Sequence, residues 1–314
     1  MKGIRSVSTK NMSREDWLAL RRHTIGGSDA AAIIGLNAWA SPYSVWADKT
    51  GRLPDKPDNE AMRQGRDLED YVARRWMEES GKKVNRVNRM LYNDLYPYAH
   101  ADIDRAVLGE YAGLECKTTS SLDVKQFKGG EFPEKYYAQC VHYLAVTGWD
   151  RWYLAVLVLG RGFYTFVLER DQDEIDALMA AEGGFWQHVK EDTPPSPDGT
   201  EATGDALQTI YSESRNEGRD LFGRESLLDE YMMIKRQSKA LELRISEIEN
   251  LIKEDMQEAE RGTCGAYTVS WKSQQRQNFQ SKEFAKAFPD VNLAPFYKTS
   301  TARPFKVSVS ASDN

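Results

Sequence analysis

The sequence predicts an α/β (α+β) fold in which helices flank a central mixed β-sheet, with a long helix and a small β element toward the C-terminus. Three observations predict this fold. Apolar residues recur at helical spacing up to residue 80, strand-like segments follow, and helical spacing then returns. Because helices and strands are interspersed along this part of the chain, a mixed sheet covered by helices is the expected architecture.

Composition limits the class of protein. The chain has 314 residues, of which 40% are apolar and 29% charged, as in a globular protein of one large or two medium domains. It has no apolar run of about 18 residues, so we expect no membrane span. Residues 1–13 are too polar for a signal peptide. A net charge of −6 excludes a histone-like basic binder, but not an enzyme that gathers its basic groups in one groove.

The three cysteines, Cys116, Cys140 and Cys264, form no close pair along the sequence. Their spacing argues against a disulfide framework and against a four-cysteine zinc or iron–sulfur site. The same cysteine usage favours a reducing compartment, so we expect a cytoplasmic protein.

Capping residues mark the first helices. Ser28 precedes a short apolar run that stops at Gly35, and Ser41-Pro42 opens another helix that ends near Gly51. The helices expected in this region span 15–20, 28–34, 41–51 and 59–80.

Segments bounded by Asn, Asp, Pro and Gly follow these helices. They predict strands over 84–91, 99–107, 113–118, 152–159 and 163–168. Gly160-Arg161-Gly162, between the last two strands, is typical of a hairpin. Helical spacing predicts further helices over 136–147 and 171–191.

We expect residues 1–192 to form the core domain, 193–225 a linker or exposed loop, and 226–314 a C-terminal extension. A strict 4-3 spacing over 226–259 predicts a long helix of about four heptads. The spaced positions hold Leu227, Tyr231, Ile234, Ser238, Leu241, Ile245, Ile248, Ile252, Asp255 and Ala259. This stripe packs either within its own chain or in a coiled coil between chains. Alternation predicts a small β element formed by Tyr267, Val269 and Trp271 and by Phe305, Val307 and Val309.

The densest chemical signal lies between residues 100 and 117. Asp104 ends one β-rich segment, and Glu115 and Lys117 share one face of the next. The two carboxylates, with the carbonyl oxygen of Cys116, are the oxygen ligands that Mg²⁺ prefers. Lys117 is suited to orienting a water or neutralising charge on a phosphate. The alternative is a solvated strand face with a cross-strand ion pair.

Several motifs then occur in order. The series begins with Arg21-Arg-His-Thr-Ile-Gly-Gly-Ser28-Asp, and a helix then carries Gly65-Arg-Asp-Leu-Glu69. Asp104, Glu115-Cys-Lys117 and Gln139-Cys-Val-His-Tyr143 complete the series. This order resembles the PD-(D/E)XK nuclease superfamily in its RecB-like branch, and the opening segment is similar to the YqaJ-type viral recombinases, relatives of phage lambda exonuclease. The resemblance covers about residues 14–190 and implies a restriction-endonuclease-like core.

The resemblance implies the role of each matching residue. Asp104 and Glu115 would hold the metal with the Cys116 carbonyl, and Lys117 would be the catalytic lysine. Gln139 would position the site, and Glu69 would reach the metal region unless it is a surface carboxylate. Three further residues are expected to support the site: Asp102, His100 and Tyr143. Asp102 departs from the uncharged residue expected at its position and competes with Asp104 for the first role.

Arg21 and Ser28 match positions that grip the 5′-terminal phosphate in lambda-type exonucleases. The residues support this independently, because Gly26-Gly27-Ser28 leads into a helix N-terminus, which favours an anion. Arg21 adds a bidentate donor. The alternatives are that Ser28 is only a helix cap, that Arg21 is a surface charge, or that Arg22 takes this role.

The resemblance implies a Mg²⁺-dependent exonuclease, with Mn²⁺ as a substitute, that degrades one strand of linear double-stranded DNA from the 5′ end. It further implies a trimeric ring, a single-strand annealing partner, and a phage or prophage protein within a bacterial host. The alternatives are another nuclease of the superfamily, single-strand-specific or endonucleolytic, and a non-catalytic DNA-end-binding module.

The expectations for two further sets of residues, the tryptophans and the basic residues near the C-terminus, are weaker. We expect a core position for Trp39, Trp46, Trp76, Trp149 and Trp152. A DNA path or a solvated surface is expected for Lys272, Arg276, Lys282, Lys286, Lys298, Arg303 and Lys306.

Overall fold

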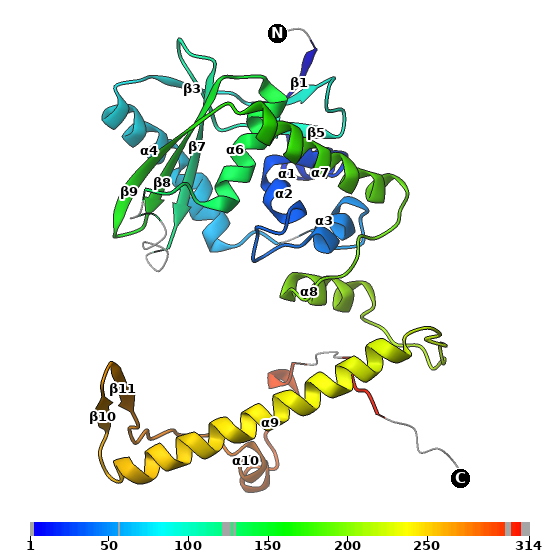
Figure 1. Cartoon of the computed structure of the whole chain (residues 1–314), viewed down its shortest axis with the longest axis vertical. Helices are drawn as coiled ribbons and strands as arrows, with labels where there is room; N and C mark the ends of the chain where they lie inside the picture. Colours follow the sequence, from blue (N-terminus) through cyan, green and yellow to red (C-terminus); the bar gives the residue numbers. More distant parts are fainter. Residues whose placement is uncertain (1–2, 56, 121–126, 128–129, 299–302, 309–314) are drawn as a thin grey trace. The chain divides into compact units, whose positions relative to one another are not determined.

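The structure, a computed structural model, describes residues 3–55, 57–120, 127, 130–298 and 303–308. The chain divides into two compact units, residues Met1–Tyr211 and Ser212–Asn314. Figure 1 shows the elements of both units in sequence colours. In the part of the chain that is described, no helix is both long and apolar enough to cross a membrane.

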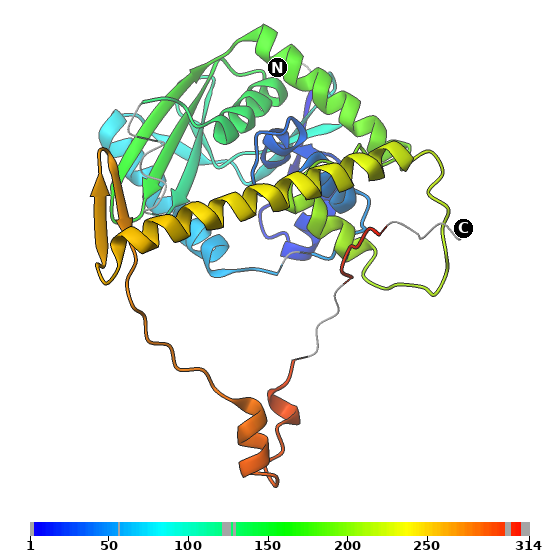
Figure 2. The same ribbon diagram turned by 60° about the horizontal axis from the view of Figure 1, so that its bottom comes forward.

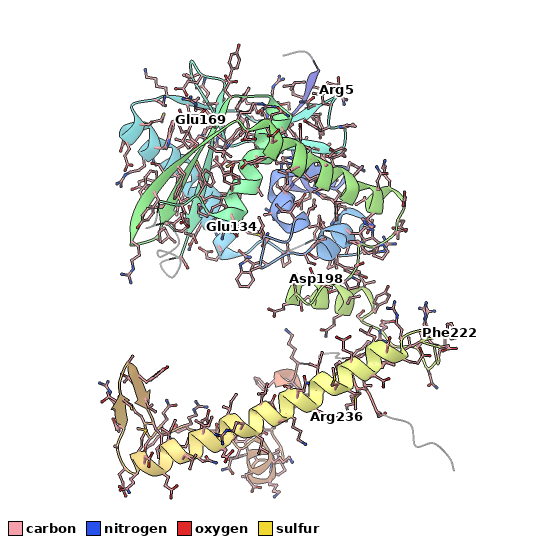
Figure 3. The ribbon with its side chains drawn as sticks, viewed as in Figure 1. Arg5, Glu134, Glu169, Asp198, Phe222 and Arg236 are labelled. Carbon is pink, nitrogen blue, oxygen red and sulfur yellow. The ribbon has the colours of Figure 1, made fainter. Side chains whose placement is uncertain are left out.

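Several helices of the first unit begin at side-chain caps that the sequence provides. The hydroxyls of Ser13 and Ser41 accept hydrogen bonds from the first turns of their helices, and the Asn59 side chain does the same for a third. These elements are α1 (Arg14–Arg22), α2 (Gly27–Ile33), α3 (Pro42–Lys49), α4 (Glu60–Ser80), α6 (Glu134–Thr147) and α7 (Gln172–Lys190). Every helix predicted before residue 192 is confirmed. Glu134, in the first turn of α6, is labelled in Figure 3.

A five-stranded mixed sheet forms the centre of the first unit, with strand order β3-β6-β7-β8-β9. Its strands are β3 (Val84–Arg86), β6 (Arg105–Val107), β7 (Ala112–Thr119), β8 (Arg151–Val158) and β9 (Gly162–Glu169). Helix α4 covers one face, and α6 lies on the other (Figure 1). On β8, Tyr153 and Ala155 pack toward α4, whereas Leu154 and Val156 belong to the opposite cluster. Apolar residues on both faces explain why this strand is an unbroken apolar run.

A second sheet, with strand order β1-β4-β5-β2, accompanies the central mixed sheet that the sequence predicts. Its strands are β1 (Ile4–Ser8), β2 (Ile25–Gly26), β4 (Arg89–Asn93) and β5 (Ala99–Asp102). The single strand predicted over 84–91 is wrong because the chain turns at Asn88, whose φ of 30° interrupts the extended backbone. The single strand predicted over 99–107 is wrong as well, because a bend at residues 103–104 sends β5 and β6 into different sheets.

Helix α8 (Glu201–Ile210) lies where the sequence predicted a linker. Thr200 caps it, and Asp198, labelled in Figure 3, accepts hydrogen bonds from the Thr200 and Thr203 hydroxyls. Ala206 packs in a cluster with Tyr43 of α3. The prolines at 194, 195 and 197 thus mark a short connection, and the first unit extends to Tyr211 rather than ending at residue 192.

The second unit consists of a long helix and short elements after it (Figure 2). They are α9 (Glu225–Met256), β10 (Arg261–Cys264), β11 (Tyr267–Ser270), α10 (Ser281–Ala287) and a 3₁₀ turn (Ala294–Phe296). The predicted long helix and the strand around Val269 are confirmed. Phe305 and Val307 lie in no strand, and Val309 lies outside the described residues. The alternation at 305–309 therefore does not extend the β element among the residues described.

Four of the five tryptophans expected in the core are buried or packed against it. Trp46, Trp76 and Trp152 are buried, and Trp149 stacks on Trp152 with ring centroids 5.5 Å apart. Trp39 corrects the expectation, because 79% of it is exposed. It lies in the loop between α2 and α3, where its backbone N–H donates to the Asn37 side chain.

Candidate active site

The candidate site is built at one end of the central sheet. Asp104 lies in the bend between β5 and β6, and Glu115 and Lys117 lie on β7. The antiparallel register pairs Arg105 with Leu114, so Asp104 comes beside Glu115. Cys116 N donates a hydrogen bond to Asp104 Oδ2 at 2.8 Å, which ties the bend to β7.

Glu115 is 3% exposed, and its two oxygens have different surroundings. Oε1 accepts hydrogen bonds from Gln139 Nε2 at 2.7 Å and from Lys117 Nζ at 2.5 Å. Oε2 is buried and has no hydrogen-bond partner among the described residues. A buried carboxylate oxygen without a donor is costly unless a cation or an ordered water satisfies it.

Burial and charge shift the pKa of each group in this cluster. Burial raises the pKa of Asp104 well above its ordinary value, and the charges of Glu115 and Glu69 add to the effect. Burial also raises the pKa of Glu115, against the opposing charge of Lys117. Burial alone would lower the pKa of Lys117, but Glu115 and Asp104 outweigh it and raise that pKa. The site therefore favours added positive charge near its carboxylates.

One cleft of about 970 Å³ joins the residues that the sequence singled out. Its lining includes the following: Arg21, Ser28, Glu69, Asp104, Glu115, Cys116 and Lys117. These residues come from α1, α2, α4, the bend before β6, and β7. The predicted phosphate-binding pair and the predicted metal-binding pair thus share one cleft.

Within this cleft, the geometry distinguishes Arg21 from Arg22. Arg21 Nη2 donates to Ser28 Oγ at 2.6 Å, and the guanidinium lies over the Trp17 ring at 4.6 Å. Arg22 instead pairs with Asp55 at 2.6 Å. Arg21 is therefore the arginine that is coupled to Ser28.

The N-terminus of α2 holds an acidic group that the sequence reasoning did not foresee. Asp29 accepts a hydrogen bond from Gly26 N at 3.0 Å and pairs with Lys49 at 2.7 Å. Burial opposes ionisation of Asp29, but Lys49 and Arg21 outweigh it and lower its pKa. Lys49 Nζ also donates to Arg21 O, which fixes the end of α1. An anion in the cleft would therefore be met mainly by the Arg21 and Ser28 side chains.

Comparison with known proteins gives the family of this chain. Residues 16–150 match the model of the YqaJ-like viral recombinase domain. The chain is 40% identical over 293 residues to the uncharacterized protein YqaJ of Bacillus subtilis (strain 168), covering 91% of this chain and 92% of that protein. The chain belongs to the YqaJ-like viral recombinase family.

Solved structures resemble the YqaJ-like fold at low sequence identity. The crystal structure of LHK-Exo in complex with dAMP matches with a TM-score of 0.50 and 20% identity over 57% of this chain and 94% of that chain. A second structure of this alkaline exonuclease, from Laribacter hongkongensis, matches over 57% of this chain and 94% of that chain, with a TM-score of 0.49 and 20% identity. The predicted fold class of helices around a mixed sheet is confirmed.

The donors of this YqaJ-like site fit a hard divalent cation of the magnesium type. The described residues contain no group of three or more His, Cys, Asp or Glu side chains placed to hold a metal ion. Mg²⁺ does not need such a cage, because it is usually bound by one or two carboxylates, with waters and substrate phosphates as its other ligands. Asp104, the unpartnered Oε2 of Glu115 and the Cys116 carbonyl are donors of that kind.

Glu69 lines the cleft, but in this structure it is held by an arginine. Arg105 Nη1 lies 2.5 Å from Glu69 Oε1, and Arg105 Nη2 lies 2.6 Å from Asp70. Arg105 is itself buried. Glu69 is therefore more than a solvated helix carboxylate, and its charge adds to the field at Asp104.

The three supporting residues are brought together only in part. Asp102 and His100 do not belong to the described lining of the cleft. Asp102 accepts a hydrogen bond from Trp17 Nε1 at 2.6 Å, and His100 Nδ1 pairs with the Thr24 hydroxyl at 2.8 Å. The Tyr143 hydroxyl accepts from Gln139 and donates to Asp102 O at 3.1 Å. This geometry favours Asp104 over Asp102 as the carboxylate beside Glu115.

Three residues near the site were not assigned a role from the sequence. Arg105 follows Asp104 directly, so its position beside the carboxylates was a usable signal. Trp17, which connects Arg21 to Asp102, sits on the amphipathic α1 and gave a weaker one. Lys49 gave no signal in the sequence, because a lysine in the last turn of a helix is ordinarily solvated.

Proposed function

We propose that this protein is a Mg²⁺-dependent 5′→3′ exonuclease that degrades one strand of linear double-stranded DNA. One observation carries the proposal. Arg21 and Ser28, suited to a terminal phosphate, line the same cleft as Asp104, Glu115 and Lys117, suited to phosphodiester hydrolysis. Membership of the viral recombinase family supports DNA as the substrate.

The chain's own groups supply most of the chemistry in this proposal. Asp104, Glu115 Oε2 and the Cys116 carbonyl would hold the cation. When bound, Mg²⁺ or Mn²⁺ would lower the pKa of a water and neutralise charge on the phosphate. Lys117 stays protonated because Glu115 and Asp104 raise its pKa, so it acts as a donor that orients the water or the phosphate. Gln139 holds Glu115 in place through Oε1.

The preference for a 5′-phosphate end follows from the second set of residues in the cleft, Arg21 and Ser28. Arg21 offers a charge-assisted donor, and Ser28 adds a hydroxyl at 2.6 Å from it. A 5′-terminal phosphate carries more charge than an internal phosphodiester and would bind this pair more strongly. Because the contacts are to phosphates rather than base edges, we expect little dependence on DNA sequence.

Two parts of the proposal rest on family resemblance rather than on contacts in this chain. We propose that the protein assembles as a trimeric ring around its substrate, which would keep the duplex enclosed between cleavage steps. We also propose that a single-strand annealing protein receives the strand that remains. The cytoplasm of a bacterial host is the compartment that this role requires.

The decisive experiment uses linear duplex DNA labelled separately at each end, with Mg²⁺ present. Matched substrates carry a 5′-phosphate or a 5′-hydroxyl, and a closed circle and a single strand are tested beside them. The Lys117→Ala protein and an EDTA-treated sample are the controls. We expect progressive loss of the 5′ strand, faster with the phosphate and absent from both controls.

Other outcomes would replace the proposal. Cleavage of the closed circle would indicate an endonuclease, and preference for the single strand would indicate a single-strand-specific nuclease. Binding of DNA ends without cleavage of any substrate would indicate a non-catalytic end-binding module. If Lys117→Ala lost DNA affinity but kept its cleavage rate, the role given to Lys117 would be wrong.

A further inference from the structure

The apolar stripe of α9 is exposed to solvent in its middle section. Leu241 is 65% exposed, Ile245 56% and Ile248 42%. Such large apolar side chains, spaced three and four residues apart, form one continuous seam. The helix is 32 residues long, which is about 48 Å at 1.5 Å per residue.

Among the described residues of the second unit, contacts with this helix lie near its two ends. Near its start, the Tyr231 ring meets Phe305 with centroids 5.9 Å apart. Near its end, Met256 is buried and lies 3.7 Å from the position where Gly262 would carry a Cβ. Between these two contacts residues 239–252 are all exposed, so the described residues of the second unit leave the apolar face of the middle section uncovered.

The spacing assigns each residue of α9 a place in a heptad. The d positions hold Leu227, Ile234, Leu241, Ile248 and Asp255, and the a positions hold Tyr231, Ser238, Ile245 and Ile252. This is a 3.5-residue period over about four heptads, which is the signature of a coiled coil. Ile occupies two of the a positions, and the d positions hold both Leu and Ile, so the seam suits a coil of two or of three strands. Ser238 is a polar break at an a position.

The charges at the e and g positions beside this seam determine which helix could pair with it. In a parallel arrangement, each g position faces the e position five residues later on the neighbouring helix. Glu230 then faces Lys235, and Arg244 faces Glu249, so two of the four g–e contacts are attractive. Gln237 facing Glu242 is neutral to negative, and at the fourth contact Leu251 faces Met256, which is already buried within its own unit. No like-charge contact occurs among the four, so the helix is complementary to itself.

Existing ion pairs do not prevent this arrangement. Arg244 pairs with Glu247 at 2.7 Å, and Glu249 pairs with Lys253 at 3.1 Å, both along the surface of the same helix. Such exposed pairs contribute little to stability, so exchanging them for contacts between helices costs little. The side chains that project from α9 are drawn in Figure 3, with Arg236 labelled at an outward f position.

We propose that α9 is a self-association helix through which copies of this chain form a parallel coiled coil. The occupant of the exposed seam is the same helix of the neighbouring copies. The inference deepens the assembly part of the proposed function and does not depend on nuclease activity. In a parallel bundle, the first unit of every copy is connected to the same end of the coil.

The test compares two leucines two residues apart on α9. Leu241 occupies a d position inside the seam, whereas Leu243 occupies an outward f position and is 73% exposed. Sedimentation equilibrium of the full-length protein would give the mass of the wild type, Leu241→Asp and Leu243→Asp. We expect the same oligomeric mass for the wild type and for Leu243→Asp, and at least a tenfold rise in the dissociation constant for Leu241→Asp. Circular dichroism of each variant checks that the helix persists.

A cross-linking experiment tests the parallel register and avoids a charged substitution. With the exposed Cys264 replaced by Ser, Leu241→Cys and Leu243→Cys are each oxidised under the same conditions. Only in a parallel, in-register coil do equal d positions face one another, so Leu241→Cys alone should form a disulfide between copies.

Four outcomes would overturn the proposal. A monomeric wild type would mean that the seam packs within its own chain. An oligomer that resists Leu241→Asp would mean that the first units, and not α9, hold the copies together. Equal loss of assembly in the two Asp variants, or equal cross-linking at 241 and 243, would exclude the heptad register. Nuclease activity in a monomeric variant would leave the proposed function standing while separating it from assembly.

Discussion

Gln139 on α6 and Glu115 on β7 are joined by a hydrogen bond of 2.7 Å from Nε2 to Oε1. Lys117 donates to the same oxygen, which leaves Oε2 as the unpartnered atom of a buried carboxylate. Gln139 Nε2 also lies 2.8 Å from the Tyr143 hydroxyl, so its own orientation is fixed. The glutamine therefore determines which oxygen of Glu115 is available to a cation.

This arrangement predicts the behaviour of Gln139 variants. Gln139→Leu removes the donor that orients Glu115, and outer partners of metal ligands typically contribute about 10–100-fold in metal affinity or activity. We expect the Mg²⁺ concentration for half-maximal cleavage to rise within that range, with a smaller change in DNA affinity. Gln139→Glu should be worse, because it places a further negative charge beside Glu115. The measurement is a Mg²⁺ titration of the initial cleavage rate.

The matched control for this prediction is Gln208→Leu on α8, where the side chain is exposed. It should leave the Mg²⁺ titration unchanged. An equal loss in both variants, or a Gln139→Leu protein with a wild-type Mg²⁺ dependence, would contradict a positioning role for Gln139.

Arg21 and Arg22 are neighbours in sequence but differ in their partners, and this difference predicts opposite outcomes. Arg21→Ala removes the group beside Ser28, so the preference for a 5′-phosphate over a 5′-hydroxyl end should fall by about tenfold or more, as one lost charge-assisted hydrogen bond implies. Arg22→Ala removes an ion pair with Asp55 and should keep the preference. The ratio of kcat/KM for the two kinds of end is the measurement.

Arg21→Lys refines this test, because lysine keeps the charge but loses the forked geometry. We expect it to recover part of the phosphate preference. If Arg22→Ala lost the preference and Arg21→Ala retained it, the assignment of the phosphate to Arg21 would have to be reversed.

Much of the first unit was predictable because its signals are local. Caps such as Ser41 and Asn59 mark helix starts, and the alternation of Glu115, Cys116 and Lys117 indicates a strand with two polar residues on one face. Motif order identified the site residues, and the structure brings seven of them into one cleft. Their roles in catalysis stay predictions until they are measured.

The rest required long-range information. Nothing in residues 99–107 indicates that β5 and β6 pair with different sheets, because each short segment fits either one. The seven-residue α2 gave no sign that Asp29 would be held by Lys49, whose partner lies 20 positions earlier in the chain. Trp39 was expected in the core because tryptophan usually is buried, but only tertiary packing decides which loop residues are covered.

Gly27 is a position where the backbone itself leaves room for the site. A Cβ at Gly27 would lie 2.6 Å from Tyr143 Cε1 and 3.2 Å from Gln139 Cγ. Gly27→Ala must therefore push these side chains away, and overpacking of this kind typically costs about 1–3 kcal/mol. We expect a loss of stability in that range together with a loss of cleavage, because Gln139 orients Glu115.

Gly204→Ala on α8 is the control, since no atom lies within 4 Å of its added Cβ. Within a helix this change should be neutral or stabilising by up to about 1 kcal/mol. Urea denaturation gives both values. A Gly27→Ala protein as stable and as active as the wild type would show that Tyr143 can move without consequence.

His142 and Glu182 form a fully buried pair between α6 and α7, behind the candidate site. His142 Nδ1 lies 2.8 Å from Glu182 Oε1, and Nε2 lies 2.8 Å from His100 O. Both ring nitrogens therefore face acceptors, which favours the doubly protonated ring. Burial alone would lower the pKa of His142, but the charge of Glu182 outweighs it and raises the pKa above the ordinary 6.5.

This direction fixes the sign of a pH dependence. A histidine whose pKa is raised on folding contributes stability that is fully present below its unfolded pKa of 6.5 and is lost as pH rises through its folded pKa. The wild type should therefore lose part of its unfolding free energy as the pH rises above 6.5, which measurements at about pH 6 and about pH 9 would compare. Glu182→Gln removes one partner of a buried pair, which typically costs about 3–5 kcal/mol, and should flatten that slope.

The control is Glu191→Gln, an exposed position at the end of α7, which should keep both the stability and the slope. Urea denaturation of the three proteins at both pH values measures this, and a slope that Glu182→Gln leaves unchanged would assign the pH dependence to other groups.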